Sequence, residues 1–531
     1  MKTQEILTVR DLNVSFNAGA QKVPILEDIN FEVEKGQVFG ITGQSGSGKS
    51  MTALSLIGLT RFYPNVFVKG TVIFKENDVL KMDNTSLSRI RGMNISLILQ
   101  NPEAALNAVI RCGDQICESI SIHNKHLNAG NIKEKVIRLL DEVGLNDSKR
   151  IFDAYPHELS GGQQQRVVIA MAIANNPDII IADEATSSLD ANTANDIIKL
   201  LLELKTRYGT TLIFITHDVQ LLLKIADRIM IMEGGKIVAN VTSDPTGNTE
   251  LPEVINNYVN ESAKINRREA INENDNQFLV VQHITLEYVK KPLFFWGKHT
   301  TTKVLNDINF TLNKGTTLGI FGESGSGKTS IAKIIVGIVP ATSGEILVNG
   351  KTLSKKDFEQ SPGIRRKIQY VFQDALTSLN PKLTIGEQWM EVLQYHKIIK
   401  DKKQAKERLK DIMEEFVLPA LVFDKYPYQV SGGQLQRVAL IRTLLTEPDL
   451  VIFDESLSAL DAFNQQKMVN IIIRAQKKWM FSAIFISHDP KLICAMCHKV
   501  ILLDHGSIIQ SGYTSDILPD IIEEQESKRL L

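Results

Sequence analysis

Gly43-Gln44-Ser45-Gly46-Ser47-Gly48-Lys49-Ser50 decides the fold of this chain, and a second version stands at Gly322-Glu323-Ser324-Gly325-Ser326-Gly327-Lys328-Thr329. Each version follows an apolar run typical of a buried strand, residues 38–41 and 317–320, and precedes a run with helical spacing. In such a setting the glycines let successive backbone N–H groups converge on a phosphate, and the helix N-terminus adds its dipole. The sequence therefore predicts two phosphate-binding loops.

Four further motifs recur in the same order in both halves. The first set is Gln100, Leu-Ser-Gly-Gly-Gln at 159–163, Asp183-Glu184 and His217, and the second is Gln373, Val-Ser-Gly-Gly-Gln at 430–434, Asp454-Glu455 and His488. The offset from Ser160 to Ser431 is 271 positions, and the aspartates and histidines repeat it. The offset is 273 for the glutamines and 279 for the loops. A period of this size is that of a whole domain, so we expect one domain in two copies.

The order of apolar and polar segments predicts an α/β fold in each half. Short buried strands at 179–182 and 212–215, separated by a helix of about four turns, predict a mostly parallel sheet with flanking helices. Segments with helical spacing lie between each glutamine and the Ser-Gly-Gly motif that follows it. They predict a helical subdomain inserted into each half, at about 101–175 and 374–446.

Composition marks the predicted boundary between the halves. Residues 244–276 contain eight asparagines, two prolines and few large apolar side chains, which is typical of a linker. We therefore expect a first domain at 1–243 and a second at 277–531. The second domain also contains an aromatic cluster, Phe294 to Trp296, in an insertion that the first lacks. A locally packed loop is the expected structure there, although contact with lipid or a partner is an alternative.

Overall charge and hydropathy exclude several classes of protein. The 531 residues carry 60 basic and 61 acidic side chains, a net charge of −1, whereas a dedicated nucleic-acid binder usually has a basic excess. No apolar run reaches the roughly 18 residues that a membrane span needs. The N-terminus lacks the basic and then apolar layout of a secretory signal. We expect a cytosolic chain whose work at a membrane goes through partners.

The residues around each loop supply what phosphoryl transfer requires. Lys49 is expected to reach the β- and γ-phosphates of ATP, with Ser50 as a Mg²⁺ ligand. Asp183 ends an apolar strand, where its carboxylate is expected to hold Mg²⁺ through a water molecule. Glu184 follows, and the alternation of side chains along an extended chain leaves it to orient or deprotonate the attacking water. The second-half counterparts are Lys328, Thr329, Asp454 and Glu455.

Histidines and glutamines complete each predicted catalytic group. His217 follows a strand, 33 residues after Glu184, and a neutral imidazole there can donate to the γ-phosphate and hold the acid in place. Gln100 is expected to sense the metal and the attacking water. The second-half counterparts are His488 and Gln373. Packing of the histidines in the core is the alternative.

The Ser-Gly-Gly motifs are predicted helix starts that form a second anion site. Ser160 is a good N-cap, and a glycine-flanked N-terminus with a free hydroxyl suits a phosphate. Because each half already has its own loop, we expect a head-to-tail sandwich, in which Ser160 caps ATP held by Lys328 and Ser431 caps ATP held by Lys49. Phe16 and Tyr288, upstream of the loops, are expected to stack on adenine, with a place in the core as the alternative.

The complete set of predicted ATP contacts follows from these motifs. It comprises Phe16, Gly43, Ser45, Gly46, Gly48, Lys49, Ser50, Met51, Ser160, Gly161, Gly162 and Gln163 in the first half. In the second half it comprises Tyr288, Gly322, Ser324, Gly325, Gly327, Lys328, Thr329, Ser330, Ser431, Gly432, Gly433 and Gln434. The predicted Mg²⁺ ligands are Ser50, Gln100, Asp183, Thr329, Gln373 and Asp454.

Together these motifs resemble the ATP-binding cassette (ABC) family over nearly the whole chain. Residues 159–163 match its Leu-Ser-Gly-Gly-Gln signature, and Val430 departs from it in the second half. The resemblance implies two tandem nucleotide-binding domains, each with a mainly parallel core, an antiparallel β part and an inserted helical subdomain. It also implies that ATP and Mg²⁺ are cofactors and that Glu184 and Glu455 are catalytic bases. Asp190 and Asp461 match the loop that crosses the interface between cassettes.

A narrower resemblance points to the ATPases of dipeptide, oligopeptide and nickel importers. Residues 373–381, Gln-Asp-Ala-Leu-Thr-Ser-Leu-Asn-Pro, are similar to the QDPxxSLNP stretch of that group, and residues 100–107 are a weaker version. The group implies import of peptides or of a nickel- or metallophore-like solute. It further implies two integral-membrane permease subunits, an extracytoplasmic solute-binding protein, and a peripheral place on the cytoplasmic face of the membrane. The chain lacks the cysteine-rich C-terminal extension of many members.

Two alternatives belong to other classes. One is a soluble twin-cassette ATPase that acts on ribosomes or DNA, and the other is the fused ATPase of another ABC transporter class. The near-zero net charge, the short asparagine-rich linker and residues 373–381 favour the importer, with no nucleic acid as partner.

Overall fold

The computed structural model describes residues 4–18, 21–44, 46–187, 189, 191–242, 268, 276–290, 300–323, 325–372, 375–399, 401–458, 460 and 462–529. It divides into two compact units, Met1–Glu261 and Ser262–Leu531, and each is described by itself. The linker bounds inferred from composition, 244 to 276, stay a prediction. The aromatic cluster from Phe294 to Trp296 lies outside the described residues.

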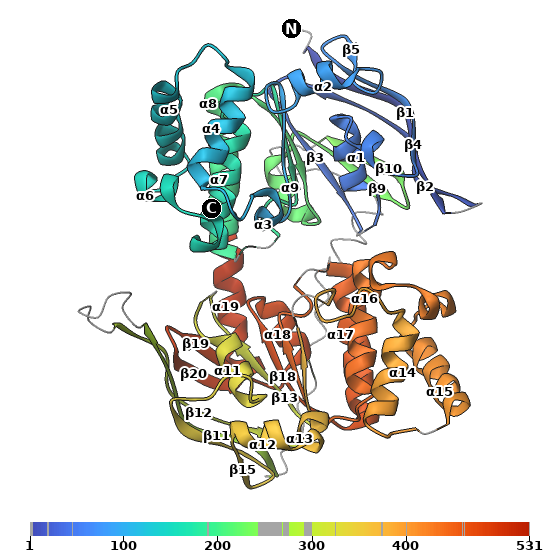
Figure 1. Ribbon diagram of the computed structural model, residues 1–531, viewed down its shortest axis with the longest axis vertical. Helices are drawn as coiled ribbons and strands as arrows, with labels where there is room; N and C mark the ends of the chain where they lie inside the picture. Colours follow the sequence, from blue (N-terminus) through green and yellow to red (C-terminus); the bar gives the residue numbers. More distant parts are fainter. Residues whose placement is uncertain are drawn as a thin grey trace. The chain divides into compact units, whose positions relative to one another are not determined.

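The first unit contains both strands and helices, which alternate along part of its length (Figure 1). Its strands are β1 Glu5–Ala18, β2 Gln21–Glu34, β3 Val38–Gly43, β4 Val66–Phe74, β5 Asn77–Asp78, β6 Ile95–Ile98, β7 Ile179–Asp183, β8 Thr211–Ile215, β9 Arg228–Glu233 and β10 Lys236–Thr242. Its helices are α1 Lys49–Leu56, α2 Asn84–Ile90, α3 Pro102–Ala105, α4 Cys112–His123, α5 Ala129–Glu142, α6 Ser148–Asp153, α7 Gly161–Ile173, α8 Ala191–Tyr208 and α9 Val219–Ile225. Helix α8 has 18 residues, about five turns rather than the four expected.

Two sheets form within this unit among the described residues. One has the order β2-β1-β4-β5 and is antiparallel. The other has the order β10-β9-β3-β8-β7-β6, in which neighbours pair in parallel except β10, the antiparallel edge strand. Strands β3, β7 and β8 are buried along their whole length, which agrees with their mostly apolar sequences.

The register of the parallel sheet gathers the motifs at one edge. Ile41 in β3 pairs with Ile215 in β8, and Ile215 also pairs with Asp183 in β7. The carboxyl ends of these three strands therefore meet. The phosphate loop follows the first, Glu184 the second, and His217 comes two residues after the third.

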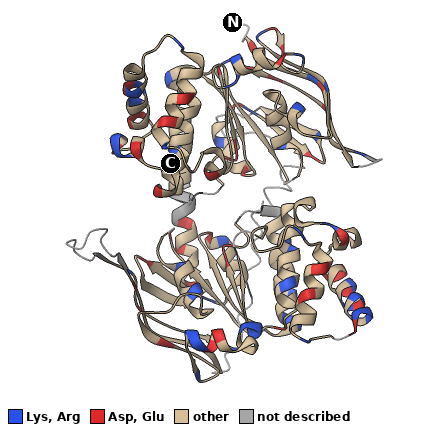
Figure 2. Ribbon diagram, in the orientation of Figure 1, with Lys and Arg blue, Asp and Glu red and all other residues tan. Residues whose placement is uncertain are grey.

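Helices α3 to α7 occupy the region where a helical subdomain is expected, and α4, α5 and α6 contact one another (Figure 1). The amphipathic sequence of α5 explains its packing, because Ile132, Val136 and Leu140 recur on one face and are buried. Charged residues of both signs also occur along α5, and along α15 in the second unit (Figure 2). Among the described residues, no helix has the length and apolar character that crossing a membrane requires.

The second unit repeats this order of elements. Its strands are β11 Gln277–Lys290, β12 Thr300–Asn313, β13 Thr317–Phe321, β14 Ser343–Val348, β15 Lys351–Leu353, β16 Ile368–Val371, β17 Leu450–Asp454, β18 Ser482–Ser487, β19 Lys499–Asp504 and β20 Ser507–Tyr513. Its helices are α11 Lys328–Ile335, α12 Lys355–Gln360, α13 Pro362–Lys367, α14 Ile385–Tyr395, α15 Lys402–Glu415, α16 Gly432–Leu444, α17 Ala462–Trp479, α18 Pro490–Met496 and α19 Thr514–Arg529. The described strands form sheets of order β12-β11-β14-β15 and β16-β17-β18-β13-β19-β20, so the topology matches the first unit.

Arg268, within the predicted linker, docks on the second unit. Its guanidinium donates to Thr317 Oγ1 at 3.0 Å, to the Met496 carbonyl and to Gln476 Oε1. These acceptors come from β13, α18 and α17, so one side chain contacts three elements. The acceptors are neutral, and burial lowers the pKa of the guanidinium.

Candidate nucleotide sites

Each predicted phosphate loop joins a strand to a helix, as expected. In the first half β3 ends at Gly43 and α1 begins at Lys49, with Gly48 at the N-cap in the left-handed region, φ +101°. The Lys49 ammonium is buried and donates to the carbonyl oxygens of Gly43 and Gln44, at 2.9 and 3.0 Å. The loop therefore holds a buried cation at the start of a helix, where an anion is favoured.

The second loop has the same construction. Lys328 begins α11 and donates to the carbonyl oxygens of Gly322 and Glu323, both at 2.8 Å. The hydroxyls of Ser47 and Ser326, within the two loops, are buried and have no hydrogen-bond partner among the described residues. The sequence reasoning did not single out these serines, although their place inside the loops was the available signal.

The aspartates are buried at the ends of β7 and β17. Burial raises the pKa of the Asp183 carboxyl, and a hydrogen bond with Ser50 opposes this rise. Burial likewise raises the pKa of Asp454, against hydrogen bonds with Tyr370 and Thr329. In both aspartates Oδ1 has no hydrogen-bond partner among the described residues. A divalent cation would satisfy such an oxygen and favour the ionised form.

The backbone conformation at each glutamate differs from the extended one that the sequence predicted. Alternation along an extended strand was expected, but β7 ends at Asp183 and Glu184 has φ +48°. Glu455 has φ +46° after β17. A left-handed backbone at a residue other than glycine costs on the order of 1–3 kcal/mol, and such strain concentrates at functional sites. The chain therefore turns sharply at the glutamate in both halves.

The first-half glutamate is surrounded by the expected residues. Gln100 Nε2 donates to Glu184 Oε2 at 2.9 Å. Glu184 Oε1 lies 3.9 Å from His217 Nδ1 and 4.0 Å from Lys49 Nζ. The structure thus brings together four residues that lie up to 168 positions apart in the sequence. Glu184 is the common neighbour of the other three.

The second half repeats this group around Glu455. Its Oε1 lies 3.5 Å from His488 Nδ1 and 3.9 Å from Lys328 Nζ. A hydrogen bond with Glu455 raises the pKa of His488 against the effect of burial. Burial raises the pKa of Glu455, but His488 and Lys328 together lower it by more, so the net shift is downward. A neutral imidazole was expected, whereas this pairing favours the protonated one.

The first-half histidine is affected by the same opposing causes. Burial lowers the pKa of His217, and the Glu184 and Asp218 carboxylates together raise it by more. Both histidines therefore hold a proton more tightly than a free imidazole before any nucleotide is bound.

The Ser-Gly-Gly motifs begin helices, as expected. Ser160 is the N-cap of α7, where Gln163 N donates to Ser160 Oγ at 3.3 Å and Ser160 N donates to Gln163 Oε1 at 3.1 Å. Ser431 and Gln434 form the same capping box at α16, at 3.4 and 3.2 Å. The capping serines and the first glycines are exposed. Each hydroxyl accepts one bond within its own helix and keeps its proton for another acceptor.

The aromatic residues upstream of the loops lie at the surface. Phe16 in β1 is 39% exposed and Tyr288 in β11 is 50% exposed. Neither is a core residue, so the alternative interpretation is wrong for both. An exposed ring on a strand is available to stack on a flat ligand.

The remaining predicted residues fall into two groups. Gly46, Gly162, Gly325 and Gly433 stand in the loops and capped helices, Gly327 is the N-cap of α11, and Met51, Thr329 and Ser330 stand in the first turns of α1 and α11. The others, Ser45, Asp190, Ser324, Gln373 and Asp461, lie outside the described residues.

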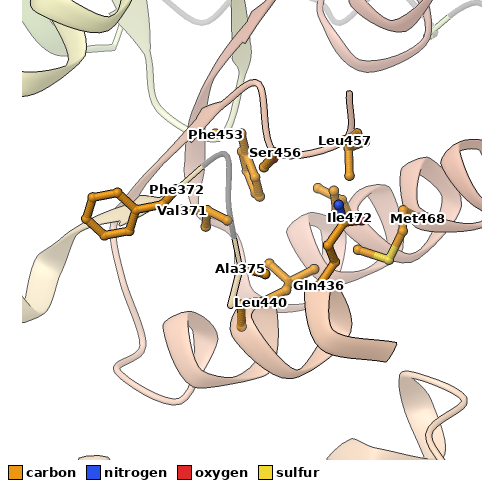
Figure 3. Close-up of a pocket in the computed structure, with 11 residues that line it drawn as sticks. Val371, Phe372, Ala375, Gln436, Leu440, Phe453, Ser456, Leu457, Met468 and Ile472 are labelled. Atoms are coloured by element: carbon orange, nitrogen blue, oxygen red, sulfur yellow. The ribbon is translucent and has the colours of Figure 1, made fainter. Parts of the chain in front are cut away.

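A separate cavity in the second half does not belong to this site. It lies where α16 meets β17 and α17 and is lined by Phe372, Gln436, Ser456 and Met468, among others (Figure 3). Its volume of about 10 Å³ is no more than one water molecule needs. We therefore assign no nucleotide contact to it.

Comparison with known proteins identifies the family. The ABC transporter family model matches residues 26–187 and 305–458, more than half of the chain. This chain belongs to the ABC transporter family. It carries two ABC cassettes in one polypeptide, binds ATP and is an ATPase. The matched ranges contain both loops, both capped helices and both Asp-Glu pairs.

Curated relatives match along nearly the full length of the chain. The peptidoglycan transport ATP-binding protein YejF of Agrobacterium fabrum is 34% identical over 517 residues, covering 97% of this chain and 94% of the relative. The ABC transporter ATP-binding protein YejF of Escherichia coli is 32% identical, with 96% of each chain covered. The glutathione import ATP-binding protein GsiA of Salmonella choleraesuis is 31% identical, covering 96% of this chain and 87% of the relative.

The residues present fit ATP and Mg²⁺. The buried ammonium groups on the loop carbonyls and the partnerless aspartate oxygens are the groups that a Mg²⁺–triphosphate would engage. When bound, the metal ion would neutralise charge on the phosphate oxygens. The chain itself supplies the backbone N–H groups of each phosphate loop, the buried lysine ammonium and the glutamate carboxylate.

Proposed function

We propose that this chain is the ATP-hydrolysing subunit of an importer for peptide-containing solutes. It works with two integral-membrane permease subunits and, through them, an extracytoplasmic solute-binding protein. It is held at the cytoplasmic face of the membrane as a peripheral protein. The names of the relatives support a peptide-type solute, since one is a peptidoglycan transporter subunit and another a glutathione importer subunit. A nickel- or metallophore-like solute is the other expectation from residues 373–381.

The observation that carries the proposal is the intact group around each glutamate. In each half, lysine and histidine nitrogens lie within 4.0 Å of Glu184 or Glu455. A carboxylate in that position can orient and deprotonate the attacking water, while the lysine holds the phosphates. Because both halves have the group, both sites are proposed to hydrolyse ATP.

The other residues take supporting roles in this proposal. Asp183 and Asp454 hold Mg²⁺ together with the loop hydroxyls and Gln100 and Gln373. The capped helices close the opposite half's site in a head-to-tail sandwich, with Asp190 and Asp461 at the interface. ATP binding closes the two halves and hydrolysis reopens them, and the motion passes to the permease through the segments after the two glutamines.

Replacement of both glutamates tests the catalytic assignment. Glu184→Gln/Glu455→Gln keeps the side-chain shape but removes the base, so we expect ATP hydrolysis to fall by at least about 100-fold while ATP binding persists. Glu203→Gln, an exposed glutamate on α8, is the matched control and should hydrolyse ATP normally. Normal hydrolysis by the double variant would refute the assignment.

The same double variant tests the transport assignment. It is purified from detergent-solubilised cells with ATP and Mg²⁺, and the recovered proteins are identified by mass spectrometry. Two polytopic membrane proteins should be recovered, and uptake of labelled peptides in cells that lack the chain then tests the solute class. Recovery of ribosomal subunits or DNA without any membrane protein would refute the importer.

A further inference from the structure

The two halves differ at one position beside the predicted metal ligand. In the second half Tyr370 in β16 pairs in parallel with Ile452 in β17, two residues before Asp454. In the first half Leu97 in β6 pairs with Ile181 in β7, two residues before Asp183. The two pairings are equivalent in the two sheets. A phenol therefore stands where the other half has an aliphatic side chain.

The tyrosine reaches the aspartate. Because alternate residues of a strand share a face, Tyr370 lies on the same side of the sheet as Ile452 and Asp454. Its hydroxyl donates to Asp454 Oδ2. Leu97 has no polar atom, so it cannot make this bond to Asp183. Both aspartates do share another hydrogen bond, with the hydroxyl residue that ends the phosphate-loop motif. This residue is Ser50 for Asp183 and Thr329 for Asp454.

Packing fixes the phenol in place. Tyr370 is partly buried and packs against the core formed by β11, β12, β13 and α11. Its ring contacts the edge of the Phe372 ring, with centroids 4.7 Å apart and an interplanar angle of 62°. The donor is thus held before any ligand arrives. With Oδ2 engaged, Asp454 presents Oδ1, which has no hydrogen-bond partner among the described residues.

We propose that Tyr370 is a positioning residue that makes the two ATP sites unequal. By holding one carboxylate oxygen of Asp454, it orients the other toward the metal ion of the Mg²⁺–nucleotide on Lys328. The site on Lys49 lacks this bond and binds Mg²⁺–nucleotide more weakly. The inference rests on the proposed role of Asp183 and Asp454 as Mg²⁺ ligands.

Site-resolved binding tests the inference. Lys49→Ala leaves the site on Lys328, and Lys328→Ala leaves the site on Lys49. Binding of a methylanthraniloyl-ATP probe is measured by fluorescence for each, with Mg²⁺ and with EDTA. A hydrogen bond to a charged group corresponds to about tenfold in affinity. In the Lys49→Ala chain, Tyr370→Phe should weaken binding by about that factor with Mg²⁺ and leave binding in EDTA unchanged.

Controls separate this bond from general damage. Tyr370→Phe removes the hydroxyl but keeps the ring and its packing. Tyr370→Leu introduces the residue that the first half has at this position. If one of these variants fails to fold, the other still tests the inference. In the Lys328→Ala chain neither change should alter binding. Equal weakening with Mg²⁺ and EDTA, or no weakening, would overturn the inference. If Asp454→Asn also leaves Mg²⁺-dependent binding unchanged, the assignment of the aspartates as metal ligands has failed instead.

Discussion

Replacing Gly43 with alanine should destabilise the first half far more than replacing Gly46. A Cβ on Gly43 would lie 2.1 Å from the Met232 carbonyl oxygen, on the neighbouring strand β9. That oxygen belongs to the backbone of the sheet and cannot move aside as a side chain does. A Cβ on Gly46 would meet nothing within 4 Å, although both glycines have positive φ, +152° and +81°.

The two costs follow from this geometry. Alanine with a left-handed backbone costs about 1–2 kcal/mol, which is the full expected cost at Gly46. Overlap with the backbone at Gly43 adds about 1–3 kcal/mol, for a total of about 2–5 kcal/mol. For a domain of this size, 1 kcal/mol corresponds to about 2–4 °C. At the middle of that range, about 3 °C per kcal/mol, we expect the melting temperature of the first half to fall by roughly 3–6 °C for Gly46→Ala and 6–15 °C for Gly43→Ala.

Differential scanning calorimetry of the full chain measures both changes. The second half tests the contact without the backbone cost, because Gly322 is not among the glycines with positive φ. A Cβ on Gly322 would lie 2.2 Å from the Leu503 carbonyl oxygen, and one on Gly325, at φ +84°, would meet nothing within 4 Å. Equal destabilisation by Gly43→Ala and Gly46→Ala would refute the reasoning, since it would mean that contact with the strand is not what excludes a side chain.

Three further predictions concern the second half. Ser431→Ala and Thr384→Ala each remove the cap of a helix with a capping box, so each should cost about 1 kcal/mol of unfolding free energy. Only Ser431→Ala should also lower ATP hydrolysis, and an equal loss with Thr384→Ala would contradict the proposed phosphate contact. Because Glu455 raises the pKa of His488 in the folded state, their pairing stabilises the fold fully below the unfolded pKa, and this is lost as pH rises through the raised value. NMR titration should show that Glu455→Gln lowers that pKa, and an unchanged value would contradict the pairing. Trp389 is fully buried and its Nε1 donates to the Val438 carbonyl at 3.1 Å, so Trp389→Ala should cost about 3–5 kcal/mol in chemical denaturation. A loss below about 1 kcal/mol would show that this helical region does not depend on it.

Much of the fold was predictable because buried positions require apolar residues, which are visible in the sequence. Strands β3 and β7 are mostly apolar, and a fully buried parallel strand allows few polar residues. The loop at Gly43 and the capping serine at 160 were predictable for a similar reason. Left-handed backbone and helix caps each accept few residue types.

Other features could not be predicted, because they depend on backbone conformation or on contacts between residues that are far apart in the sequence. The turn at Glu184 replaces the expected extended backbone, and φ +48° at a glutamate has no sequence signature. The bond from Tyr370 to Asp454 joins residues 84 positions apart, on strands whose pairing had first to be known. The raised pKa of His488 likewise follows chiefly from its approach to Glu455, and its chain neighbour Asp489 makes a smaller contribution.

The docking of Arg268 has a consequence for assembly. Only residues 243–267 separate the end of β10 from this contact on the second unit. At about 3.3–3.6 Å per residue, that stretch spans at most about 90 Å. Confinement within such a radius sets a local concentration of one half around the other of at least about 0.5 mM. If the two halves pair as proposed, two separate chains would lose that pairing on dilution, whereas in this chain the local concentration does not depend on dilution. One proteolytic cut in the stretch would remove that advantage.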